Sequence, residues 1–129
     1  MSEMSTLRQI LLVCSRGPTR LFRQNTGQGW VGQSRRFSRP ETVIVQPGDV
    51  LIRNARPLHA GLCEGSSDLI GWTQRDGAAV FTAIEVKAER GRVTPEQAQF
   101  VEVVTAAGGI AGIARSVEDA QRLIDRSSV

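Results

Sequence analysis

The chain has 129 residues, 40% of them apolar, with a formal net charge of +3 at pH 7, which fits one domain over residues 1–129 and is too short for two. It contains no apolar run near the roughly 18 residues that span a membrane and no N-terminal signal-peptide pattern, so we expect a cytoplasmic protein without membrane association. Cys14, Cys63 and the single histidine, His59, support neither a structural zinc site nor a disulfide framework.

The N-terminal third is expected to form a helix, a strand and two loops. Residues 5–15 have helical apolar spacing and end before Gly17-Pro18. Residues 19–24 can form a strand. A glycine-rich loop follows over residues 25–32, without the lysine of a nucleotide-binding loop. Residues 33–41 are then expected to be an exposed loop with an aromatic ring among arginines.

A second pair of strands is expected in the middle of the chain. Residues 42–45 and 49–54 are apolar runs separated by Gln46-Pro47-Gly48, which is a turn signal. Residues 55–65 then form a loop that leads to Asp68. His59 lies in this loop and could titrate near neutral pH, but a lone loop histidine can equally be incidental.

Residues 68–87 have the pattern of a β-hairpin. The runs 68–73 and 80–87 are rich in β-branched and aromatic residues, and Asp76-Gly77 between them is a strong two-residue turn signal. If these two residues form the loop, Thr73 faces Val80, Gly71 faces Thr82 and, without a bulge, Asp68 faces Glu85.

The opposed pair of Asp68 and Glu85 is unfavourable unless another charge compensates the repulsion between the two carboxylates. Like charges directly across two strands are destabilising, whereas a divalent cation would remove that repulsion. Lys87 projects on the same side as Glu85, where its ammonium could polarise a water or stabilise developing charge. The alternative is a solvated strand face that carries an ion pair.

The last third is expected to form a helix, a strand and a helix. Thr94 is a plausible N-cap, and Gln97 completes a capping box while bordering the helix stripe that packs on the sheet. Residues 110–114 follow as a short buried strand, and Ser116 opens a final helix. The order predicts an α/β sandwich with a mixed central β-sheet flanked by helices.

The chain resembles a VRR-NUC domain, a branch of the PD-(D/E)XK nuclease superfamily, over about residues 20–126 and most strongly from Gly61 onward. The resemblance implies a restriction-endonuclease-like fold of the small standalone type found in phages and bacteria. It rests on these motifs in this order: GSSDLIG at 65–71, EVK at 85–87, Gly91, TPEQ at 94–97, GGIAGIA at 108–114 and SVEDA at 116–120.

What the resemblance implies is a phosphodiesterase that depends on Mg²⁺ or Mn²⁺. The metal would be held at Asp68, Glu85 and Val86, with Lys87 activating the water and Gln97 supporting the site. Family members commonly carry a glutamate on an N-terminal helix. Here Glu3 lies one turn too early, so no glutamate is assigned to that role.

DNA is the expected partner. Residues 1–60 carry nine arginines against three acidic residues, while residues 61–129 carry seven basic against ten acidic residues. This basic half indicates either a nucleic-acid surface or a solvated basic face. The candidate DNA contacts are Arg20, Arg23, Asn25, Arg35, Arg36 and Ser67.

Standalone relatives of this kind are similar to Holliday-junction resolvases, which implies a homodimer that cuts four-way junctions. The absence of an assigned N-terminal glutamate motivates a second hypothesis, a catalytically weak or inactive DNA-binding module of the same fold. A third hypothesis is a purely structural partner subunit.

Overall fold

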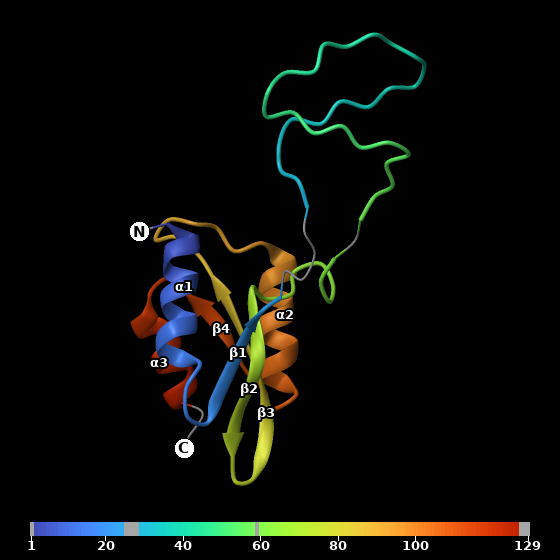
Figure 1. The fold of residues 1–129 in the computed structure, drawn as a ribbon. Coiled ribbons are helices and arrows are strands. Elements are labelled where there is room, and N and C mark those ends of the chain that lie inside the picture. Colours follow the sequence, from blue (N-terminus) through green and yellow to red (C-terminus); the bar gives the residue numbers. More distant parts are fainter. Residues whose placement is uncertain (1, 25–28, 59, 127–129) are drawn as a thin grey trace. The chain divides into compact units, whose positions relative to one another are not determined.

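The computed structural model describes residues 2–24, 29–58 and 60–126, which fall into two units (Figure 1). The first unit comprises residues 1–26 and 60–129, and the second comprises residues 27–59. All helices and strands of the described residues belong to the first unit. No helix in this described part is long and apolar enough to cross a membrane.

A mixed sheet forms the centre of the first unit, as the sequence predicted, and it has four strands. Its strands lie side by side in chain order, β1 beside β2, β2 beside β3 and β3 beside β4. The first three strands pair antiparallel, and β4 pairs parallel to β3. Their bounds are β1 Thr19–Arg23, β2 Leu69–Arg75, β3 Ala78–Val86 and β4 Ile110–Ala114.

The hairpin register is confirmed. Thr73 pairs with Val80 and Gly71 with Thr82, and the ladder continues to Leu69 opposite Ile84. Asp76 and Gly77 turn the chain with φ of 51° and 79°, the positive values that an Asp-Gly turn supplies most easily. The next step of the same register brings Asp68 beside Glu85.

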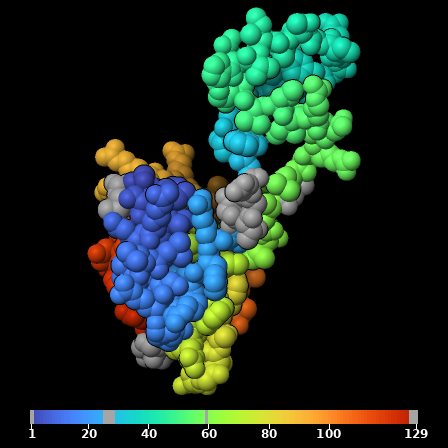
Figure 2. Space-filling model, in the orientation of Figure 1, coloured from blue at the N-terminus to red at the C-terminus, as the bar shows by residue number. Residues whose placement is uncertain are grey.

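Helices cover both faces of the sheet (Figure 1). α1 (Glu3–Cys14) and α3 (Val117–Arg126) lie on one face, and α2 (Pro95–Ala106) lies on the other. Figure 2 shows α1 and β1 in blue over the near face of the first unit, with α3 in red at its edge. The core lies under α1 and α3 and comprises Leu7, Ile10, Cys14, Leu21, Leu69, Ile84, Val86, Ala114, Ala120 and Ile124.

α1 begins earlier than predicted. The sequence pattern placed the helix over residues 5–15, whereas its first residue is Glu3. Ser2 is the N-cap, and its side chain accepts a hydrogen bond from the backbone N–H of Ser5. Because a cap of this kind satisfies an otherwise unpaired N–H, it extends the helix by a partial turn and brings Glu3 into it.

The predicted strand pair 42–45 and 49–54 is not formed, and this prediction is wrong. The turn between these segments is present, since the Asp49 N–H donates to the Gln46 carbonyl at 3.0 Å and Gly48 has a φ of 90°. The flanking residues form no strand, and their side chains are exposed. An isolated two-stranded hairpin is at best marginally stable, because no third layer covers its apolar side chains.

Candidate active site

Asp68 lies directly before β2, next to the ends of β1 and β3. Its backbone carbonyl accepts a hydrogen bond from the Gln24 N–H at 2.9 Å. Its side-chain Oδ2 accepts from the Val86 N–H, also at 2.9 Å. The carboxylate is therefore fixed across the hairpin next to Glu85, and Val86 has a structural role at this point through its backbone.

Glu85 is a buried carboxylate, with 3% of its surface exposed. Its Oε1 accepts a hydrogen bond from Gln97 Nε2 at 2.9 Å. Its Oε2 is also buried and has no hydrogen-bond partner among the described residues. Burial, followed by the negative charge of Asp68, raises the pKa of Glu85 to about 7, against a smaller opposing effect of Lys87.

Gln97 performs both functions that its position in the sequence indicated. Its Oε1 accepts from the Thr94 N–H at 3.0 Å, and its own N–H donates to Thr94 Oγ1 at 3.1 Å, which completes the capping box. The remaining Nε2 is the group that reaches Glu85. The start of α2 thereby locks the amide in place, so that it presents a donor to the buried carboxylate.

Lys87 lies one residue beyond the end of β3. Its Nζ is 3.8 Å from Glu85 Oε1, and 13% of its side chain is exposed. Its N–H continues the parallel ladder by donating to the Ala114 carbonyl at 3.0 Å. The ammonium therefore lies beside the Glu85 carboxylate and is largely buried.

Arg115 anchors the loop that follows Lys87. Its Nη1 donates to the carbonyls of Ala88, Glu89 and Gly91, at 2.6, 3.1 and 2.8 Å. This contact was not anticipated from the sequence, because Arg115 is separated from the loop by the whole of α2 and β4. It immobilises the backbone directly after the lysine.

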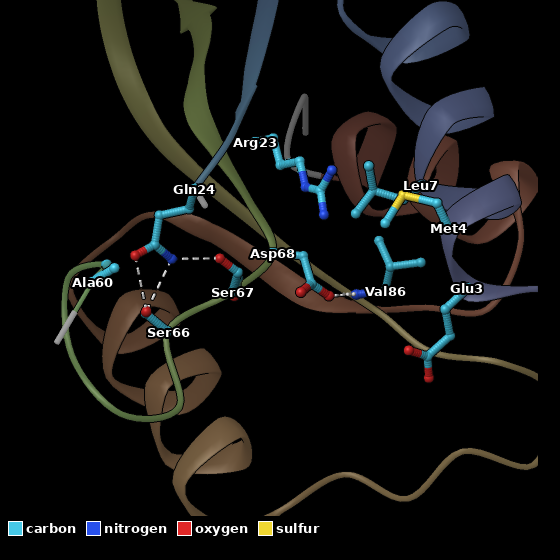
Figure 3. A pocket seen from close by; sticks show the side chains of 11 residues that line it. Glu3, Met4, Leu7, Arg23, Gln24, Ala60, Ser66, Ser67, Asp68 and Val86 are labelled. Carbon is cyan, nitrogen blue, oxygen red and sulfur yellow. Dashed lines mark hydrogen bonds between the residues drawn. The ribbon is translucent and has the colours of Figure 1, made fainter. Parts of the chain in front are cut away.

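A cavity of about 260 Å³ opens beside Asp68 (Figure 3). Figure 3 shows Asp68 near the middle of the view, where its carboxylate accepts a hydrogen bond from the Val86 N–H and has Arg23 and Leu7 nearby. The residues that line it are Glu3, Met4, Leu7, Arg23, Gln24, Ala60, Gly61, Ser66, Ser67, Asp68 and Val86.

Glu3 is one of the residues that line this cavity. The predicted helix start at residue 5 left Glu3 outside the helix. With the helix beginning at Glu3, the carboxylate hangs from its first turn, and Oε1 accepts from the Ala88 N–H at 3.1 Å. The N-cap serine was the signal in the sequence that could have found it.

Gln24 holds the loop in front of Asp68. Its Nε2 donates to Ser66 Oγ at 2.9 Å and to the Ser67 carbonyl at 2.6 Å. Figure 3 shows this amide turned toward the loop. Ser67 Oγ is buried and has no hydrogen-bond partner within the described ranges, so its side chain faces inward rather than into open solvent.

The candidate DNA contacts are distributed over both units. Arg23 lines the cavity, whereas Arg20 is on the sheet, where its Nη1 donates to the carbonyls of residues 17 and 19. Arg35 pairs with Glu41 and lies over an aromatic ring in the second unit, which also holds the exposed Arg36. Asn25, like His59, lies outside the described residues.

The site fits a hard divalent cation. In the part of the chain that the structure describes, no three His, Cys, Asp or Glu side chains converge. The two carboxylates of Asp68 and Glu85 are sufficient for a cation that takes its other ligands from water and substrate phosphate. The observation that favours a cation is Glu85 Oε2, a buried oxygen without a partner, next to a second carboxylate.

Comparison with known proteins identifies one family. The model of the VRR-NUC domain matches residues 41–118, which is more than half of the chain. The match includes the carboxylate pair, the lysine and the capped start of α2. No curated protein and no solved structure matches the chain.

Proposed function

This chain belongs to the VRR-NUC domain family, a family of nucleases, and we propose that it is a metal-dependent, structure-specific DNA endonuclease. It would hydrolyse phosphodiester bonds in branched DNA in the manner of a Holliday-junction resolvase. Nuclease families of this kind generally use divalent metals, and we propose Mg²⁺ or Mn²⁺ here. We place its action in the cytoplasm of a bacterium or of a phage-infected host cell.

The observation that carries the proposal is the unpartnered Oε2 of Glu85 beside Asp68. A buried acceptor without a donor costs about 1–3 kcal/mol, and a second carboxylate beside it adds repulsion. Both costs are relieved by a cation held between Asp68 and Glu85, with the Val86 carbonyl as a further oxygen. When bound, such a cation supplies a more acidic water and neutralises charge on the phosphate.

Three further side chains have separate roles around the pair of carboxylates. Gln97 restrains Glu85 in one rotamer, so the carboxylate does not reorganise during the reaction. Lys87 presents a cation at 3.8 Å from the same carboxylate, where it can orient a water or offset developing negative charge. Arg23 on the wall of the cavity is placed to contact a phosphate.

The alternative of an inactive DNA-binding module was motivated by the lack of an N-terminal carboxylate. Glu3 lines the same cavity as Asp68, and its Oε1 accepts from the Ala88 N–H. A carboxylate of α1 on the wall of this cavity supports the proposal of an active enzyme. The resolvase-like proposal further requires two sites for paired incisions, which a homodimer provides.

The test is cleavage of a labelled four-way junction, beside a linear duplex and a splayed arm, with Mg²⁺, with Mn²⁺ and with chelator. Wild type is expected to make paired nicks at the junction in the presence of metal. Asp68→Asn, Glu85→Gln and Lys87→Met should each lose cleavage. The matched control is Glu102→Gln, which neutralises an exposed carboxylate on α2 and should cut like wild type.

Metal binding has its own readout. Mg²⁺ or Mn²⁺ should raise the melting temperature of wild type, because a ligand that binds the folded state stabilises it, and should leave Asp68→Asn unchanged. Junction binding without cleavage in either metal would leave the DNA-binding module as the better description. Retained cleavage in Asp68→Asn and Glu85→Gln would refute the assignment of the site.

A further inference from the structure

Three aromatic rings are exposed on the α2 side of the sheet. Phe22, Trp72 and Phe81 are 54%, 42% and 41% exposed. Trp72 lies directly opposite Phe81 across the hairpin, and the rings of Phe22 and Trp72 are 5.5 Å apart. These three residues are called the aromatic surface below.

The exposed apolar area of the aromatic surface is larger than that of a single exposed apolar residue. With aromatic side chains of roughly 200 Å² each, the three rings leave on the order of 300 Å² of apolar area in solvent. Patches of that size on a monomer often mark an interaction site. α2 packs on β4 and β3, whereas Phe22 and Trp72 lie on β1 and β2.

Opposite charges stand at opposite ends of the aromatic surface. Arg20 is the strand partner of Trp72 and is exposed at one end. Glu96 is exposed at the other end, beside the loop that precedes Asp68: a Cβ added to Gly65 would lie 2.4 Å from the Glu96 backbone. α2 itself carries two acidic residues and no basic one.

This charge pattern disfavours a nucleic acid. A nucleic-acid surface needs several cations along the path of the phosphates. Among the described strand residues on this side of the sheet, Arg20 is the basic one. Glu96 would repel a phosphate at the far end.

The same pattern suits a second copy of this chain. A two-fold axis through the aromatic surface places each end against the other end of its partner, so Arg20 meets Glu96 of the partner subunit twice. The exposed rings then form an apolar centre with a charged rim, which is the usual composition of a protein interface.

We propose that the aromatic surface is the contact between two copies of this chain. The choice of a second copy rests on the paired-cut function proposed above, and the inference adds which surface is used. Trp72 is four residues along β2 from Asp68, which is about 13 Å. Each carboxylate pair would therefore lie close to the symmetry axis, where two strands of one junction can be reached together.

The first experiment measures mass in solution by light scattering across a dilution series, without DNA or metal. Wild type is expected at twice the 14.0 kDa chain mass. Trp72→Arg should be monomeric. The matched control is Leu12→Arg, which places the same charge at a 69% exposed leucine of α1, on the other side of the sheet, and should stay dimeric. Thermal melting confirms that each variant is folded.

The second experiment tests the predicted ion pair. Arg20→Glu and Glu96→Arg should each weaken the dimer, because each places like charges together at both ends. The double variant should restore it. Restoration requires the two residues to meet across the interface, which a general loss of stability would not produce.

Several results would overturn the inference. A wild type that is monomeric throughout, a Trp72→Arg variant that remains dimeric, or a double variant no tighter than the single ones would each do so. In a monomeric Trp30→Phe protein, Trp72 is the remaining tryptophan. Quenching of its fluorescence by single-stranded DNA would show that bases stack on it and would assign the surface to DNA instead. DNA cleavage by a monomer would leave the proposed function intact, and a dimer that never cuts would leave the interface intact.

Discussion

Replacing Glu85 by glutamine should stabilise the metal-free protein, and by more as the pH rises. The pKa of Glu85 is raised in the folded state from 4.5 to about 7. A raised pKa means that the protonated carboxyl stabilises the fold at low pH, and that this stability is lost as the pH rises from 4.5 through 7. The full loss corresponds to about 3 kcal/mol, and less where the site relaxes around the charge.

Glutamine avoids this loss because it stays neutral at every pH. Its side-chain oxygen can still accept from Gln97 Nε2, and its amide can donate to Asp68. The free energy of unfolding should be measured by urea titration in chelator, at about pH 5 and about pH 8. Wild type should lose roughly 2–3 kcal/mol relative to Glu85→Gln between these values.

Two results would refute this reasoning. One is a Glu85→Gln protein that is less stable than wild type near the higher pH. The other is a stability difference that does not grow with pH. Glu102→Gln serves as the control for removing a carboxylate, since it is exposed on α2 and should change stability by less than about 0.5 kcal/mol at either pH.

Further predictions concern the backbone and the thiols. Gly65→Ala should destabilise the protein by several kcal/mol in urea titration and disturb Asp68, because the new Cβ would lie 2.4 Å from the α2 backbone. Gly77→Ala should cost only about 1–2 kcal/mol, because Gly77 also has a positive φ but its Cβ would point into open space. Arg115→Ala should lower the cleavage rate more than substrate affinity, because it frees the loop after Lys87; equal effects on both would contradict this role. A thiol reagent should label Cys63 at once and Cys14 only on unfolding, since Cys14 is buried and burial raises its pKa; equal rates would contradict the packing of α1.

The hairpin and the capped helix could be predicted because their determinants are local. Asp76-Gly77 accepts a turn that most residue pairs resist, and the strand period of two then sets which residues face each other. Thr94, Pro95 and Gln97 likewise define a helix start within four residues. From these two features the sequence predicts that Asp68, Glu85 and Gln97 meet, and the hydrogen bond between Gln97 and Glu85 confirms the second contact.

The errors arose where neighbours in the chain are not neighbours in space. Residues 42–54 have strand-like sequences, yet they form no strand, and an isolated two-stranded hairpin is at best marginally stable. Glu3 fell outside the predicted helix, whereas the N-cap at Ser2 starts α1 at this residue and the Ala88 N–H fixes its carboxylate.

By itself, then, the sequence determined the turn, the strand register, the helix cap and thus the pair of carboxylates with their amide support. Each follows from backbone geometry and hydrogen bonding within a few residues. The tertiary structure alone decided that Glu3 and Arg23 line one cavity with Asp68, that Arg115 holds the loop after Lys87, and that three aromatic rings stay uncovered. These depend on how helices pack on the sheet, which is set by the burial of the whole apolar surface and not by any short run of residues.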